Sequence, residues 1–455
     1  MLFKFVKKII GSICAGALLA MQLSMPVPAQ TQATALPDDS AVLARYLDQT
    51  GGMTADEAVR VALENNGELA ALRKELEAAR SLIKQARLRA NPTLEASGSK
   101  QISGTDSQLM VQGMLPLELG GRRAARILVA ERETVVREKA VADRERLLAA
   151  EVRAKFGEAL AETLKLKLIE DLLSAATEGL RLVASRVSEG KTAPLEENMT
   201  LVEVNRLRSM RETQSGKTEI AFLELRNLLG MKPEEALRIR GDFRDLLTPL
   251  PPLVEATISA LQNRPDLAAM RAAEDLAEAQ IEQARAEGRL DAGLTAGYQR
   301  MNSSFPLSGI TDTGQLRPIQ DVFNFFTFGI TLQLPVRNRN QGAIEAAIST
   351  REAAQKRREF AELVVRREVA SAFARYGSVA RAMEIFRVGV RDQAEKNLAV
   401  VRQTYELGAR NLIDYLVEER RFIELENEFI DAQLATYQGK VEILRAMNAP
   451  ELTNK

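Results

Sequence analysis

Histidine and cysteine, two side chains that enzymes often use for acid, base or nucleophilic chemistry, are nearly missing from this sequence of 455 residues. It has no histidine and no tryptophan, and its single cysteine is Cys14. A Ser/His/Asp or Cys/His catalytic arrangement is therefore excluded, as are a histidine-ligated zinc and the HExxH motif. No glycine-rich phosphate loop is present either. Only carboxylate chemistry could support an enzyme, so we predict a protein that is not an enzyme and that carries no cofactor.

Methionine offers the only soft metal ligands outside the N-terminal region. Met110 and Met114 would lie on one face of a predicted strand, and thioethers suit Cu(I). Two methionines at this spacing are more typical of packing or of a barrel surface than of a metal site. With no cysteine beyond Cys14, neither a thiolate site nor a disulfide framework is expected. We therefore predict no bound metal.

Charge and the N-terminal pattern indicate an exported protein without a nucleic-acid partner. Lys plus Arg number 62 and Asp plus Glu number 62, so the net charge is zero. Residues 1–29 have the layout of a secretory signal, with lysines, an apolar run over 9–20 and the cleavage motif Val27-Pro28-Ala29. We expect this signal to be removed, leaving residues 30–52 as an N-terminal extension. Lipid attachment at Cys14 is the less favoured alternative.

The remaining sequence passes twice through the same signals, which indicates an internal duplication. The segment at 65–70 corresponds to the one at 263–268, and Gly190 corresponds to Gly408. Extra residues in the second copy, near 303–324, are expected to form a loop. We assign four regions: residues 53–231 to the first repeat, 232–252 to a linker, 253–448 to the second repeat and 449–455 to a C-terminal tail.

Each repeat contains two short segments in which apolar and polar residues alternate, as in β-strands. The clearest pair lies within about 290–335, where Phe326, Phe328 and Ile330 alternate with more polar neighbours. The pair at about 92–116 alternates less cleanly and has no aromatic residue. Because a lone hairpin is barely stable, we expect these strands to pair with strands of other chains. Segments of about ten alternating residues also suit the height of a membrane barrel.

Long helices make up the rest of each repeat. Residues 122–187 and 343–407 are predicted as unbroken helices of about 65 residues, each spanning on the order of 100 Å. Their apolar residues recur at three- and four-residue steps, which is typical of helices that pack lengthwise. Shorter helices are expected before the strands and after each glycine turn: residues 54–89, 195–229, 253–288 and 412–447.

This order and its duplication resemble the TolC family of outer-membrane efflux ducts. The residues that carry the resemblance are Asn91-Pro92-Thr93-Leu94, Pro116, Pro335, Asn263-Arg264-Pro265-Asp266-Leu267 and the turns at Gly190 and Gly408. The resemblance implies a mainly α fold with a small β part. It also implies a trimer in which each chain gives four strands to a twelve-stranded outer-membrane β-barrel, continued by a long periplasmic α-helical barrel.

The stretch Leu115–Arg126, with Gly120-Gly121-Arg122-Arg123, resembles the CzcC-type branch associated with heavy-metal cation efflux. The implied function is the outer-membrane channel of a three-part export system in a Gram-negative bacterium. Its implied partners are two further chains of the homotrimer, a periplasmic membrane-fusion adaptor, an inner-membrane pump of the RND type and outer-membrane lipid. Drug efflux and type I protein secretion remain open alternatives. A soluble periplasmic coiled-coil scaffold is the alternative from another class, because the composition is rich in Ala, Glu, Arg and Leu.

The resemblance also implies where a periplasmic gate would lie. Asp414 follows the second glycine turn at a position where the family carries a gate aspartate, and a threefold axis would make it a ring of carboxylates that attracts cations. A second gate aspartate of the family would fall at Val417, so that part of the pattern is absent. Glu418 and Glu419 are adjacent candidates, and Glu196 is the counterpart of Asp414 in the first repeat. The alternative for each is a solvated helix charge.

The two glycine turns are the candidate docking surface for the adaptor. They would end the longest helices, although a glycine at a helix end is most often simply a cap. The candidate docking residues are Gly190, Lys191, Thr192, Gly408, Ala409 and Arg410.

Overall fold

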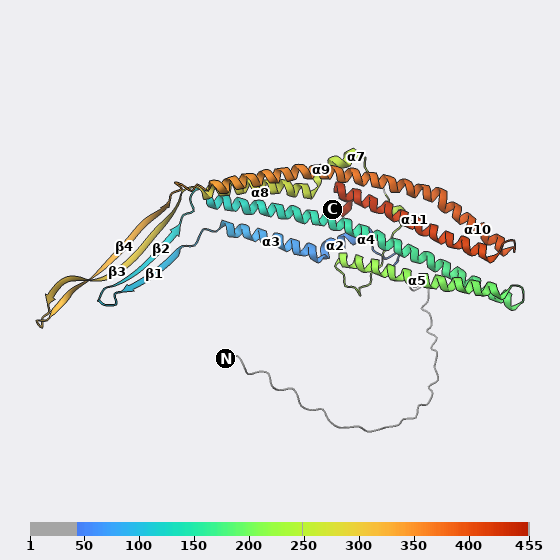
Figure 1. The fold of residues 1–455 in the computed structure, drawn as a ribbon, viewed down its shortest axis with the longest axis horizontal. Coiled ribbons are helices and arrows are strands. Elements are labelled where there is room, and N and C mark those ends of the chain that lie inside the picture. Colours follow the sequence, from blue (N-terminus) through green and yellow to red (C-terminus); the bar gives the residue numbers. More distant parts are fainter. Residues whose placement is uncertain (1–42, 248, 454–455) are drawn as a thin grey trace, which may run out of the picture. The chain divides into compact units, whose positions relative to one another are not determined.

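A computed structural model describes residues 43–247 and 249–453 of the chain (Figure 1). The expected signal, with Cys14, and the first part of the N-terminal extension lie outside the described residues. Across the described ranges, no helix combines the length and the apolar character that a membrane-spanning helix needs. The same ranges contain no cluster of three or more acidic, histidine or cysteine side chains suited to holding a metal ion.

The described residues are mainly helical, with a small antiparallel sheet, as the sequence predicts. The helices of the first repeat are α2 (Ala55–Asn65), α3 (Gly67–Arg87), α4 (Arg122–Ser188) and α5 (Pro194–Leu229). Those of the second are α7 (Leu253–Asn263), α8 (Pro265–Glu287), α9 (Gln341–Phe386), the π-helical turn η1 (Arg387–Arg391), α10 (Asp392–Glu406) and α11 (Leu412–Met447). The described residues also include two single-turn helices, α6 (Phe243–Leu246) between the repeats and α12 (Pro450–Thr453) near the C-terminus.

Both helices expected before the strands are divided in two, which corrects the prediction of one continuous helix in each. Asn66 separates α2 from α3, and its side-chain oxygen accepts a hydrogen bond from the Leu69 amide at 3.1 Å. In the second repeat Arg264 is extended and Pro265 opens α8. A proline lacks the amide that would continue the preceding helix, and a side-chain cap satisfies a free amide of a new one.

The second long helix is also not continuous, because η1 interrupts it between α9 and α10. At this turn Arg391 pairs with Glu426 of α11 at 2.7 Å, and its guanidinium lies 5.0 Å from the centre of the Phe429 ring. Phe386, just before the turn, stacks on the same ring at 6.2 Å between centroids. A π-helical turn changes which side chains face a neighbour. We attribute the interruption to these contacts with α11, because both side chains reach Phe429.

The strands form one antiparallel sheet in the order β1-β2-β3-β4. Their bounds are β1 (Thr93–Lys100), β2 (Ser107–Pro116), β3 (Asp291–Ile310) and β4 (Leu316–Gln333). The two hairpins therefore pair with each other inside one chain, with Met114 opposite Thr295. The four strands of one chain thus form a single sheet, and the expected pairing with strands of other chains stays a prediction for its edges. Strands β1 and β4 remain as the two edges of the sheet.

Most of the extra residues at 303–324 belong to strands, which corrects the expected loop. Strands β3 and β4 continue past Ser304 and Gln320 to a pair between Ile310 and Leu316. The chain reverses only at Gly314, which has a φ of 77°. Glycine adopts this left-handed conformation without steric cost, so the turn forms there and the hairpin is longer than the alternation alone suggested.

One face of the β3–β4 hairpin is a continuous apolar surface. Tyr298 lies opposite Phe326, and Ala296 lies opposite Phe328. The side chains of Phe326 and Phe328 are 76% and 80% exposed in the single chain. The helices of the same chain leave this surface uncovered, and an apolar surface of this extent marks contact with a membrane or another protein.

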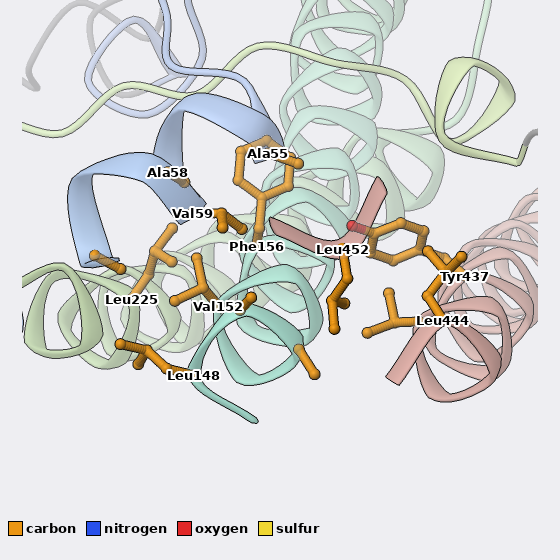
Figure 2. Packing of buried hydrophobic residues seen from close by; sticks show 14 of the residues in the cluster. Ala55, Ala58, Val59, Leu148, Val152, Phe156, Leu225, Tyr437, Leu444 and Leu452 are labelled. Carbon is orange, nitrogen blue, oxygen red and sulfur yellow. The ribbon is translucent and has the colours of Figure 1, made fainter. Parts of the chain in front are cut away.

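The hydrophobic core lies where the two repeats meet, and residues from both chain ends enter it. Figure 2 shows Phe156 of α4 close to Ala55 and Val59 of α2, while Tyr437 and Leu444 of α11 approach Leu452 of α12. The expected linker is also packed. Its Ile239 and Phe243 are fully buried, and Ile239 pairs through parallel bridges with Leu47 of the N-terminal extension and with Met53, the first residue of the first repeat. These contacts hold the middle parts of the long helices together.

Candidate functional site

The two glycine turns lie at the ends of the helices away from the sheet (Figure 1). Gly190 between α4 and α5 has a φ of 73°, and Gly408 between α10 and α11 has a φ of 75°. Each glycine amide returns a hydrogen bond to a carbonyl of the preceding helix, Val187 at 3.0 Å and Tyr405 at 2.9 Å. These left-handed caps are the usual way to stop a helix, and they form the tips of two helical hairpins.

The candidate docking residues are nearly all accessible at these tips. Thr192 is half-buried, whereas Gly190, Lys191, Gly408, Ala409 and Arg410 are exposed. Two apolar side chains next to the turns, Leu195 and Leu407, are also exposed. The tips therefore present small, basic and apolar groups to whatever meets them.

The candidate gate residues do not form one cluster in the single chain. Asp414 is exposed in the first turn of α11, where its backbone amide donates to the side chain of Asn411 at 2.9 Å. Glu418 is half-buried. Glu196 of α5 accepts a hydrogen bond from the Tyr405 hydroxyl of α10 at 3.4 Å, so it links the two hairpins. Burial, followed by the negative charge of Glu196, raises the pKa of Tyr405.

Glu419 differs from the other candidates because it is buried. Only 2% of its surface is exposed. Burial first, and then the negative charge of Glu203, raises the pKa of Glu419 from 4.5 to about 7. No hydrogen bond or ion pair joins its carboxyl group to another described residue. Glu419 is thus buried between helices, and it is not the solvated helix charge that was the alternative for this residue.

Glu203 of α5 is the partner that the sequence did not predict. It is 1% exposed and accepts hydrogen bonds from Arg206 of its own helix, at 2.8 Å from Nε, and from Arg420 of α11, at 3.0 Å. Burial alone would raise its pKa, but the hydrogen bonds from the two arginines outweigh burial and lower it. Glu203 is therefore charged next to Glu419. Nothing in the local sequence distinguishes it from the exposed glutamates of the same helix.

A cavity of about 340 Å³ lies between the two hairpins and is lined by both buried glutamates. Its wall combines apolar groups such as Leu182 and Leu416 with Tyr405 and Tyr415, whose rings are stacked at 5.9 Å. Just beyond it, a small apolar cluster joins α4, α5 and α11 through Leu173, Val204, Leu207 and Ile423. The interface between the two hairpins thus consists of an apolar cluster and a cavity that is partly lined by polar side chains.

Comparison with known proteins identifies the class of this fold. The family model for outer membrane efflux proteins matches residues 58–231 and 258–449. The chain is 25% identical over 400 residues to the cobalt-zinc-cadmium resistance protein CzcC of Cupriavidus metallidurans, covering 88% of this chain and 91% of that protein. It is 26% identical over 408 residues to the outer membrane protein OprJ of Pseudomonas aeruginosa, covering 86% of this chain and 82% of OprJ. A crystal structure of CusC matches with a TM-score of 0.68 at 20% identity, covering 86% of this chain and 91% of CusC.

These findings confirm the resemblance stated from the sequence, both to the TolC family and to the CzcC type. They also agree with the observed combination of long helices and a small antiparallel sheet. The roles of the individual gate and docking residues stay predictions. The chain belongs to the outer membrane efflux protein family: it is a TolC-family efflux channel of the outer membrane with a periplasmic helical part, and it is not an enzyme.

Proposed function

We propose that three copies of this chain assemble into a duct that exports heavy-metal cations. The observation that carries the assembly is the sheet, which ends in two free edges, β1 and β4, and has an uncovered apolar face. Lipid offers no hydrogen bonds to an open edge, so such a sheet must close with further copies. Three chains with four strands each would give a twelve-stranded barrel, with the apolar face of Phe326 and Phe328 toward lipid.

The cargo proposal is supported by the similarity to the cobalt-zinc-cadmium resistance protein, at 25% identity over most of both chains. A duct needs no tight cargo site, because conduction requires that cations also leave. Asp414 fits a passage for cations, since its exposed carboxylate would be repeated three times around the axis. Glu418 and Glu196 lie near the same end and would add negative charge.

The helical tips are proposed as the contact with a periplasmic membrane-fusion adaptor, which joins the duct to an inner-membrane pump of the RND type. The exposed Gly190 and Gly408 leave room for a close approach of another helical hairpin, and the exposed Leu195 and Leu407 offer apolar area beside them. Apolar contacts surrounded by polar groups are typical of protein interfaces.

A growth experiment tests the cargo. The gene is deleted in its own host, and survival is measured in graded Co²⁺, Zn²⁺ and Cd²⁺, with graded organic antibiotics as the comparison. We expect the deletion to lower the tolerated concentration of the metals, and a plasmid copy to restore it. Unchanged metal tolerance, with sensitivity only to antibiotics, would replace the metal proposal by drug efflux.

The gate is tested separately by the conductance of the purified protein in a planar bilayer. Asp414→Asn removes one negative charge per chain from the proposed ring and should lower selectivity for cations over anions. Glu424→Gln on the exposed side of the same helix is the matched control. Equal selectivity in Asp414→Asn and the unmodified protein would remove Asp414 from the gate.

A further inference from the structure

The buried face of α11 near the tip contains an ionisable side chain, Glu419, where its pattern calls for an apolar one. Leu412, Leu416, Glu419 and Ile423 are all buried and follow one another at steps of three and four residues, so they share one face of the helix. This face contacts the α4–α5 hairpin through the apolar cluster that contains Ile423. Glu419 therefore sits inside the contact between the two hairpins.

Charged groups approach Glu419 from each neighbouring helix, and the three arginines that act on its pKa are each paired with another carboxylate. Arg206 and Arg420 are both bound to Glu203. Arg402 of α10 pairs with Glu406 one turn later, at 3.1 Å. The titratable and charged groups around Glu419 or on the wall of the shared cavity are Glu178 and Arg186 of α4, Glu203 and Arg206 of α5, Arg402, Tyr405 and Glu406 of α10, and Tyr415 and Arg420 of α11.

At this position a neutral Glu419 is favoured over a charged one. The neutral acid leaves one buried negative charge, that of Glu203, with its two arginines. Loss of the proton places a second carboxylate beside it in a buried position, where like charges repel strongly and neither is fully hydrated. Separation of the hairpins relieves this repulsion, because water enters the cavity and hydrates both groups.

We propose that Glu419 is a proton-controlled latch between the two helical hairpins: its neutral acid allows α10–α11 to pack against α4–α5, and its ionisation drives them apart at the tip. The cavity supplies the space that the movement opens, and the apolar cluster at Ile423 supplies a fixed point beyond it. The cavity lies at the end of the helices proposed above as the gate. The link to gating rests on the proposed function, whereas the movement itself does not.

The direction of the pH dependence follows from the number of protons that the closed and the separated arrangements bind. Separated hairpins release the Glu419 proton near its ordinary value of 4.5, and the closed arrangement holds it to about 7. Between these values the closed arrangement binds more protons, so rising pH favours separation until the closed form has also lost its proton. Glu203 does not oppose this trend, because its own pKa is lowered and it stays charged throughout the interval.

Distance measurements between spin labels test the latch in the full chain extracted in detergent. Asn198 of α5 and Gln403 of α10 are exposed, lie near the two tips and take no part in the cluster. Labels at Asn198→Cys and Gln403→Cys are specific, because the only other cysteine lies in the expected signal. We expect the distance between them to lengthen as the pH rises from about 4 to about 8.5, with most of the change between about 4.5 and about 7.

Three variants of the labelled chain test whether Glu419 causes the pH-dependent change in distance. Glu419→Gln, a permanent mimic of the neutral acid, should keep the short distance at every pH, and Glu419→Leu should do the same. Glu424→Gln, exposed on the same helix, should move like the unmodified chain. An unchanged distance in the unmodified chain across the pH range would overturn the proposal, and so would a pH response in either Glu419 variant equal to that of the unmodified chain. Because these distances need no metal transport, loss of the cargo proposal would leave the result intact.

Discussion

Arg420 of α11 lies 3.0 Å from Glu203 of α5, and this contact joins the two helical hairpins across their interface. Arg420→Ala should weaken that interface, because Glu203 is buried and would keep only Arg206. Loss of one hydrogen bond to a buried charge costs about 2 kcal/mol. We expect faster proteolysis near the tips and a lower midpoint of unfolding in denaturant. Arg421→Ala is the control, because Arg421 is exposed and has no ion pair within the described ranges; an equal loss in both variants would contradict the role of the Glu203 contact.

Stability of the helical part should fall as the pH rises from about 4.5 to about 7, because the pKa of Glu419 is raised in the folded chain. A group with a raised pKa contributes its full stability below its unfolded pKa and loses that contribution as pH passes its folded pKa. The difference corresponds to about 3 kcal/mol per chain. Unfolding midpoints measured across this range should flatten in Glu419→Gln. An identical slope in the variant would assign the pH dependence to other groups.

Two glycines of α4 should respond in opposite ways to alanine. A Cβ on Gly157 would lie 2.6 Å from the ring of Tyr437 in α11, whereas a Cβ on Gly179 meets nothing within 4 Å. Gly157→Ala should therefore destabilise the fold by about 1–3 kcal/mol through overpacking. Gly179→Ala should stabilise it by about 0.5–1 kcal/mol, because alanine is the better helix former. Thermal unfolding of both variants checks this, and equal shifts would show that α4 and α11 are not this close.

Opposite faces of β4 should tolerate a charge differently. Phe328 belongs to the exposed apolar face, and the neighbouring Thr327 points to the other face. If the apolar face contacts lipid, Phe328→Arg costs about 2–4 kcal/mol near the middle of the membrane, and Thr327→Arg in the lumen costs little. We expect Phe328→Arg to be lost from isolated outer membranes while Thr327→Arg is retained. Normal amounts of both variants in the membrane would contradict the orientation of the sheet.

The sequence was most informative where local patterns decide the structure. Left-handed caps need glycine, so Gly190 and Gly408 predicted both turns, and alternation predicted the hairpins. The breaks at Asn66 and Pro265 follow from local capping and proline chemistry, but the surrounding helical periodicity continues across them and hides them. The π-helical turn could not be predicted, because it depends on contacts with Phe429 in another helix.

The candidate site was predictable only in part, for a related reason. Position after the glycine turn led to Asp414 and Glu419, yet nothing local distinguishes an exposed glutamate from a buried one. Glu203 became apparent only when α5 and α11 were placed together, since one of its two arginine partners, Arg420, is far away in the sequence. The face of Leu412, Leu416 and Ile423 contained the one usable signal, a glutamate in an apolar stripe.

The central claim, a trimeric duct, is tested most directly by the mass of the complex that is extracted from the outer membrane. The chain with its signal is expressed in a Gram-negative host, and outer membranes are isolated. The protein is extracted with detergent, and its mass is determined by native mass spectrometry. We expect a mass of three mature chains in the outer-membrane fraction. A monomer released with the soluble periplasmic proteins would contradict the duct and favour a coiled-coil scaffold.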